Sequence, residues 1–262
     1  MEQNTIDFLL QSVDLFLLVF MRVSGIFVSA PIFSNENTPM VARIGMAGMI
    51  SFILMPLVEG TAVVHSGNLI LFAGQSIQEL LVGILIGFVG AVYFSLTSLA
   101  GTLLDRQTGF AMVNAIDPLS DTEMPIFGSF YNILFVFIFL SINGHHIFIR
   151  ALNDSYHQIP IGHVIILSDD LVRGMITFFR DMTVMAFLLS LPVVVTSFLA
   201  NVVLGIFAKT MPQINVFVVG MPLRIVVGML TIWVTLQALL PFSESFFDRM
   251  FQGIYQMIQL LS

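Results

Sequence analysis

The sequence predicts an all-α membrane protein with about six hydrophobic helical segments. Of the 262 residues, 57% are hydrophobic and only 10% are charged, whereas a soluble domain has about 25% charged residues. Several windows are free of charge and about as long as a bilayer requires. No strand-like alternation of apolar and polar residues stands out. Helices are therefore the regular structure that we expect.

The charge-free windows place four membrane segments, at 80–104, 124–149, 182–208 and 225–243. Two further segments are less clean, because 8–30 carries Asp14 and Arg22 and 44–58 is short. The start of the chain is acidic, the wrong sign for a cleavable signal peptide, so the first segment is expected to stay in the protein. The polar stretch 150–181 is expected to be the main connection outside the membrane, with amphipathic helix near its end.

Prolines and glycines interrupt these segments. Seven prolines lie in or beside them: Pro31, Pro39, Pro56, Pro125, Pro192, Pro222 and Pro241. Pro192 is expected to kink its helix, because it removes one backbone hydrogen bond. Gly83, Gly87 and Gly90 share one helical face, where small residues let helices pack closely. Unpaired backbone at membrane depth is tolerated only inside protein or beside a wet cavity, so we expect an assembly or an aqueous path.

Charges within and beside the segments need an explanation. Arg22 lies in the middle of the first segment, eight residues from Asp14 and too far for an i, i+4 pair. A lone charge at the centre of a lipid-facing helix costs roughly 2.5–3.5 kcal/mol, so we expect a partner for Arg22 on another helix or chain. Four more charges flank segments, where they either snorkel to the interface or are buried at subunit contacts: Glu79, Asp105, Lys209 and Arg224.

The sequence supplies no active site that we can build. His145 and His146 are adjacent and cannot ligate one metal as an i, i+4 pair would. Cysteine is absent, which excludes a thiol nucleophile and a thiolate metal site. A net charge of −7 argues against nucleic acid as a partner. We therefore predict a protein that is not an enzyme and that has no cofactor and no metal.

Five sequence blocks resemble the FliR family, the flagellar biosynthesis proteins of the type III export gate. In order, they are RVSGIFVSAPIFSNENTP at 22–39, AGTLLDRQTGFAMVNAIDP at 100–118, NGHHIFIRALNDSYHQIPIG at 143–162, LPVVVTSFLANVVLGIFAKTMPQINVF at 191–217 and VGMPLRIVVGM at 219–229. Injectisome homologues share these blocks, so an injectisome export gate subunit is the alternative. The resemblance implies a structural pore subunit that passes unfolded flagellar substrates across the bacterial inner membrane, within the flagellar basal body.

The family fold, as the resemblance implies it, joins two smaller gate subunits in one chain. Residues 1–176 resemble the P-type subunit, and residues 177–262 resemble the helical hairpin of the Q-type subunit. The implied assembly is a right-handed helical stack around a pore, much of it raised out of the bilayer plane. The implied partners are the P-type and Q-type subunits, the switch protein and the large gate protein of the export apparatus, membrane lipid and the unfolded substrates. Arg22 and the broken segments would need these neighbours, so the chain is expected to be unstable alone.

The block around DRQTGFAMVNAIDP is implied by the resemblance to form a plug loop within the pore, over residues 106–117. Glycine permits a close turn, Phe and Met supply soft apolar bulk, and Asn and Asp tie a loop down through local hydrogen bonds. The alternative is an ordinary interhelical loop. The candidate plug residues are Arg106, Gly109, Phe110, Met112, Asn114 and Asp117.

The turn KTMPQINVF at 209–217 is expected to face the cytoplasm at the pore entrance. Its candidate residues are Lys209, Pro212, Gln213 and Asn215. The positive-inside rule favours the opposite end, which carries more arginine, but that rule presumes ordinary bilayer spans, and we follow the family. A second functional class stays open at this point. Broken helices with isolated charges also mark the midplane sites of secondary transporters, although no inverted repeat stands out.

Overall fold

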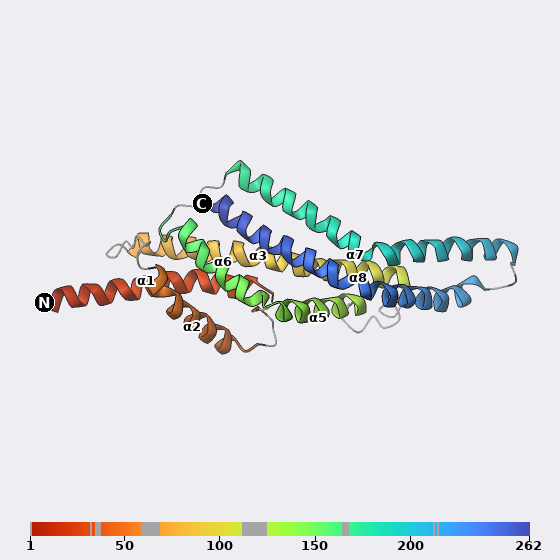
Figure 1. Ribbon diagram of the computed structural model, residues 1–262, viewed down its shortest axis with the longest axis horizontal. Coiled ribbons are helices and arrows are strands. Elements are labelled where there is room, and N and C mark those ends of the chain that lie inside the picture. Colours follow the sequence, from red (N-terminus) through yellow and green to blue (C-terminus); the bar gives the residue numbers. More distant parts are fainter. Residues whose placement is uncertain are drawn as a thin grey trace. The chain divides into compact units, whose positions relative to one another are not determined.

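The computed structural model describes residues 2–31, 33–34, 38–58, 69–111, 125–163, 168–211, 213 and 215–262, without the side chains of 2–11 and 216–217. These residues contain no strand and form the helices α1 (Glu2–Ser29), α2 (Met40–Val58), α3 (Leu69–Thr108), α5 (Ile126–Ser141), α6 (Gly144–Gln158), α7 (Asp169–Thr210) and α8 (Val216–Leu261) (Figure 1). Five of them are long and apolar enough to cross a membrane, and α5 with α6 would add a sixth as one broken span. The predicted all-α membrane fold is confirmed.

The chain divides into two compact units. Unit 1 comprises Met1–Val92, Ile142–Phe178 and Arg249–Ser262, and unit 2 comprises Tyr93–Ser141 and Phe179–Asp248. The boundaries fall inside α3, α7 and α8, so each of these helices contributes to both units. Both units also use residues from either side of position 176. The predicted division into a P-like part (1–176) and a Q-like part (177–262) comes from the family resemblance and not from contacts within the chain, so it stays a prediction.

Two sequence-based boundaries were wrong. The window 124–149 does not form one helix, because α5 ends at Ser141 and α6 begins at Gly144. Asn143 between them has a φ of 57°, a left-handed conformation that asparagine tolerates better than most residues. The stretch 150–181 contains more helix than expected, since α6 runs to Gln158 in addition to α7, which starts at Asp169 near the expected place; its position outside the membrane stays a prediction.

Most of the prolines do not end helices. Pro39 and Pro125 directly precede α2 and α5, near the first helical position where the missing N–H costs nothing. Pro56, Pro192, Pro222 and Pro241 lie inside helices that continue past them. In α7 the Thr196 hydroxyl donates to the carbonyl of Pro192 at 2.9 Å.

An aromatic cluster forms the centre of unit 2. It joins α3, α5 and α8 through Tyr93, Phe94, Phe135, Phe139, Phe246 and Phe247, all of them buried. Between helices, the ring centroids of Phe135 and Phe246 lie 4.8 Å apart, and those of Tyr93 and Phe246 lie 5.2 Å apart with the rings nearly perpendicular. Edge-to-face pairs of this kind add about 0.5–1.5 kcal/mol each beyond the area that they bury. The cluster holds α3, α5 and α8 together within unit 2.

The hairpin helices α7 and α8 pack against each other within each unit (Figure 1). In unit 1 Gly174 contacts the side chain of Leu260, and in unit 2 the Thr231 hydroxyl donates to the Thr196 hydroxyl at 3.0 Å. Their outward faces are strongly apolar. In their most apolar windows only 28% of the α7 residues and 17% of the α8 residues are buried, against 61% in α3. Lipid or other protein must cover the rest.

Candidate functional site

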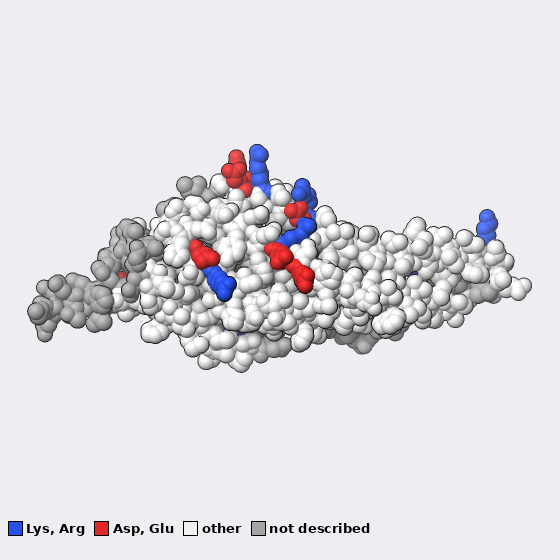
Figure 2. Space-filling view, in the orientation of Figure 1, with Lys and Arg blue, Asp and Glu red and all other residues white. Residues whose placement is uncertain are grey.

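The predicted site residues lie in three places. Arg22 and Glu79 meet in unit 1, the first plug residues lie at the end of α3 in unit 2, and the predicted entrance residues lie between α7 and α8. Figure 2 shows how few charged side chains reach the visible face of the protein. Arg22, Glu79 and Asp105 are buried charged residues, and the contacts that stabilise each of them are described below.

Glycines bring the two charges of unit 1 together. Gly25 on α1 lies three residues after Arg22, and Gly83 on α3 lies four residues after Glu79. A methyl group at Gly83 would overlap the carbonyl oxygen of Arg22, and one at Gly25 would overlap the carbonyl oxygen of Leu80. The backbones of α1 and α3 thus touch, which small residues alone permit. The packing role predicted for Gly83 and its neighbours Gly87 and Gly90 is confirmed, since added methyl groups there would overlap Ser29 and clash with Phe148.

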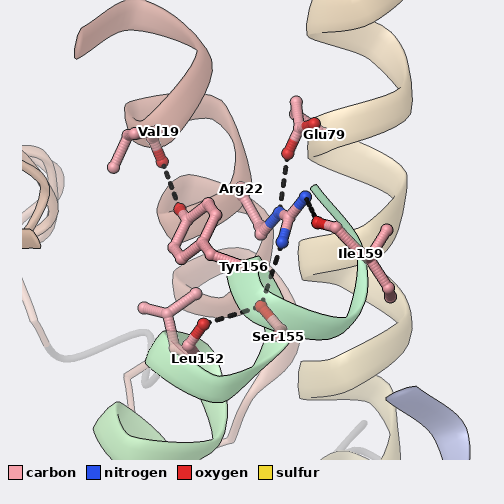
Figure 3. Close-up of polar contacts among 7 residues, drawn as sticks. All are labelled: Val19, Arg22, Glu79, Leu152, Ser155, Tyr156 and Ile159. Atoms are coloured by element: carbon pink, nitrogen blue, oxygen red, sulfur yellow. Dashed lines mark hydrogen bonds and ion pairs between the residues drawn. The ribbon is translucent and has the colours of Figure 1, made fainter. Parts of the chain in front are cut away.

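Arg22 is fully buried and uses every nitrogen of its guanidinium group (Figure 3). Its Nε lies 2.6 Å from Oε2 of Glu79. The terminal nitrogens donate to the Ser155 hydroxyl at 3.1 Å and to the Ile159 carbonyl at 2.9 Å. The guanidinium carbon lies 4.2 Å from the ring centroid of Tyr156, a cation–π distance. The expected partner on another helix is confirmed, since Glu79 lies on α3. All the partners of Arg22 belong to its own chain, so the expectation that Arg22 needs neighbouring subunits was wrong.

The ion pair also holds the turn that follows α6. Arg22 binds the carbonyl of Ile159 at the start of this turn, while the Glu79 carboxylate accepts a hydrogen bond from the backbone of Gly162 at its end. Gly162 has a φ of +89°, which favours glycine. The Tyr156 hydroxyl donates to the carbonyl of Val19 at 3.3 Å, so α6 is tied to α1 a second time. The cluster therefore positions α1, α3 and the α6 end relative to one another.

The predicted plug loop begins at the end of α3. Arg106 is exposed, and Gly109, with a φ of +88°, ends the helix. Phe110 is half-buried and its ring lies edge-on to Phe127 of α5, with centroids 5.4 Å apart. Met112, Asn114 and Asp117 lie outside the described residues, as does the rest of 112–124.

Asp105 and Arg224 differ in their surroundings. Asp105 is 4% exposed, so it does not snorkel, and its carboxylate accepts from the N–H of Phe127 at 3.4 Å. Arg224 on α8 is half-buried, and its Nε has no hydrogen-bond partner among the described residues. It lies between Met221 and Gly228, which approach Gly109 and Thr108 at the end of α3. Arg224 thus shares the α8 face that meets the start of the predicted loop.

The predicted entrance lies at the end of α7. Lys209 and Gln213 are exposed, and Pro212 lies outside the described residues. Asn215 is exposed and precedes α8, where its side-chain oxygen accepts from the N–H of Val218 at 3.4 Å. Asn215 is therefore placed to cap α8, a role that asparagine commonly has. Its predicted role at a pore entrance stays a prediction.

Sequence reasoning missed several residues of these places. Ser155, Tyr156 and Ile159 complete the Arg22 cluster, and they lie in a block already quoted for its family resemblance. Gly101 and Gly128 meet backbone to backbone, but neither belongs to a regular glycine spacing. Nothing local marks such partners, because their contacts join distant parts of the chain. Within the described residues, no group of three or more His, Asp or Glu side chains is close enough to hold a metal ion.

The long apolar helices and the buried charges define the class of this protein, a multi-pass all-α membrane protein. Residues 13–250 match the family of bacterial export proteins, family 1, and the chain belongs to that family. It is 31% identical over 248 residues to the flagellar biosynthetic protein FliR of Bacillus subtilis (strain 168), covering 94% of this chain and 95% of that protein. It is 28% identical over 265 residues to the FliR protein of Escherichia coli (strain K12), covering 100% and 99%.

A more distant relative agrees with these two. The FliR protein of Aquifex aeolicus (strain VF5) is 25% identical over 245 residues, which cover 93% of each chain. The resemblance to the FliR family is confirmed, and the chain is a component of the flagellar export apparatus. This assignment favours protein export over the secondary transporter considered from the sequence.

Proposed function

We propose that this protein is a structural pore subunit of the flagellar type III protein export gate in the bacterial inner membrane, within the basal body. It would pass unfolded flagellar substrates and have no enzymatic activity of its own. Its partners would be the P-type and Q-type gate subunits, the switch protein and the large gate protein. The injectisome alternative has no support from the relatives named above, which are all flagellar.

One observation carries this proposal beyond family membership. Helix α7 runs for 42 residues without a break, about twice the roughly 20 residues that span a bilayer. Its first part, up to Asp181, contains five charged residues, yet Val172, Ile176 and Phe179 form an exposed apolar stripe there. Charges exclude this part from the hydrocarbon core, and an apolar stripe outside lipid fits contact with protein. A subunit of a helical assembly that rises out of the membrane has this property.

The proposed roles of the predicted residues follow from this assembly. Residues 106–117 would seal the resting pore, with Phe110 and Met112 as the apolar constriction, because water leaves a narrow hydrophobic neck. Gly109, whose φ of +88° suits glycine, would supply the turn. The connection with Lys209, Gln213 and Asn215 would form the cytoplasmic entrance.

The seal is tested by deleting residues 110–115 in the full chain, produced together with the other gate subunits. We expect the deletion to leave assembly intact and to raise ion leakage across the membrane, measured as loss of viability at high external salt and as conductance in bilayers. The matched control is Gly205→Ala in α7, where an added methyl group meets nothing within 4 Å. An assembled deletion variant as tight as the control would contradict the proposed seal.

A further inference from the structure

The end of α3 and the beginning of α5 are joined by three separate contacts. The first is made by Asp105, which is buried although nothing in its own helix pairs with it. Its carboxylate accepts a hydrogen bond from the backbone N–H of Phe127, the second residue of α5, at 3.4 Å. The first N–H groups of a helix have no partner within it, and α5 has no acidic residue of its own in its first turn. Asp105 thus caps α5 from another helix.

The negative charge of Asp105 also interacts favourably with the start of α5. The positive end of the helix dipole stabilises a carboxylate, by up to about 2 kcal/mol in partly buried sites. At 3.4 Å the bond to Phe127 is long, so the attraction between the carboxylate and the positive end of the α5 dipole is the larger part of the effect. The other carboxylate oxygen, Oδ2, has no partner among the described residues. A buried carboxylate is costly in such a place, which argues that Asp105 has a task beyond packing.

The second and third contacts lie on either side of Asp105. Phe110 packs edge-on against Phe127, which is 8% exposed. One turn before Asp105, the backbone of Gly101 touches that of Gly128, and a methyl group at Gly101 would overlap it. Phe127 and Gly128 of α5 therefore receive all three contacts, two from α3 and one from Phe110, two residues after its end. Both helices belong to unit 2.

We propose that Asp105, Phe110 and Phe127, with the Gly101–Gly128 contact, form a clasp that fixes the start of α5 on the end of α3. Asp105 is a positioning residue in this clasp. It holds the chain that leaves α3 close to the start of α5, so the two described ends of the connection between these helices stay near each other. Any effect of the clasp on the proposed seal at 106–117 rests on the proposed function, whereas the clasp rests only on the contacts described above.

The clasp is tested through Asp105 in the full chain, assembled with the other gate subunits. The protein has no cysteine, so Ala115→Cys gives a single label site between the two helices. Asp105→Leu keeps similar bulk but removes the acceptor, and Asp105→Asn keeps an acceptor oxygen. We expect Asp105→Leu to raise the rate of labelling by a thiol reagent about fivefold, because losing a helix cap costs about 1 kcal/mol, which is about fivefold in the equilibrium for opening the contact. Asp105→Asn keeps an acceptor oxygen but loses the charge that the α5 dipole stabilises, so its labelling rate should lie between those of the Ala115→Cys parent and Asp105→Leu.

A second variant tests the clasp independently, in case the Asp105→Leu protein does not assemble. Gly128→Ala adds a methyl group at the contact with α3, where it meets Pro125 and the carbonyl of Ser98, and it should raise the labelling rate in the same direction. Gly205→Ala, with open space around it, should not. Labelling rates for Asp105→Leu and Gly128→Ala equal to that of the Ala115→Cys parent would overturn the clasp.

Leakage of the 110–115 deletion, measured beside the labelling of the Asp105 variants, separates the two proposals. If the deletion leaks while Asp105→Leu labels like the Ala115→Cys parent, the seal stands and the clasp is wrong. If Asp105→Leu labels faster while the deletion stays tight, the clasp stands and the seal is wrong.

Discussion

The Nε of Arg22 lies 2.6 Å from the Oε2 of Glu79, across 57 residues of sequence and inside a protein that buries both side chains. The pair is possible because Gly25 and Gly83 let α1 and α3 touch. The pair also has a structural role, because Arg22 and Glu79 hold the two ends of the turn Ile159–Gly162 that follows α6. This relationship leads to the first two predictions.

Removing one member of the pair should destabilise the protein. Glu79→Leu leaves the buried guanidinium group without its counter-ion, and breaking a buried pair in this way costs about 3–5 kcal/mol. We expect the thermal denaturation midpoint of the purified gate to fall by about 10 °C. The double variant Arg22→Leu with Glu79→Leu should recover part of this loss, because no unpaired charge remains. Additive losses in the double variant would contradict the coupling.

The glycine contact between α1 and α3 should tolerate no side chain. Gly83→Ala forces the helices apart, since the methyl group overlaps the carbonyl of Arg22, and overpacking costs about 1–3 kcal/mol. Gly74→Ala, in the same helix but in open space, is the matched control and should be neutral or slightly stabilising. Yield and denaturation midpoint of the assembled gate measure both variants. Equal behaviour of the two variants would show that α1 and α3 do not touch at Gly83.

The exposed stripe of α7 should be a contact with another gate subunit. Ile176→Asp places a charge in the middle of Val172, Ile176 and Phe179, and burying an unpaired charge at an interface is strongly unfavourable. We expect recovery of the P-type and Q-type subunits with the tagged protein to fall about tenfold. Asp170→Asn, a change at an exposed position of the same part of α7, should not reduce recovery. Full recovery with Ile176→Asp would exclude the stripe from the interface.

The orientation of the hairpin can be measured directly. Gln213 is exposed between α7 and α8, and the protein has no other cysteine to compete with Gln213→Cys. We expect an impermeant thiol reagent to label this position only from the cytoplasmic side. A cysteine at exposed His163, after α6, serves as the comparison site. Labelling of Gln213→Cys from the periplasm alone would reverse the proposed orientation and agree with the positive-inside rule.

Local properties of the sequence predicted the class of the protein and much of its helix content. Charge-free windows identified the cores of α3, α7 and α8, because apolar length is what a bilayer requires. They failed at Asn143 and over 150–158. There one residue in a left-handed conformation breaks an apolar run, and a polar sequence is helical because one of its faces is buried, with Phe148, Ala151, Leu152 and Tyr156 inside.

The sequence by itself determined that this is an all-α membrane protein, that Gly83, Gly87 and Gly90 lie at a helix contact, and that the chain resembles the FliR family. These features depend on composition, on spacing within one helix and on short blocks. Only the tertiary structure decided that Glu79 is the partner of Arg22 and that Asp105 caps α5. Those pairings depend on which backbones approach closely enough, and close approach is a property of two distant segments together.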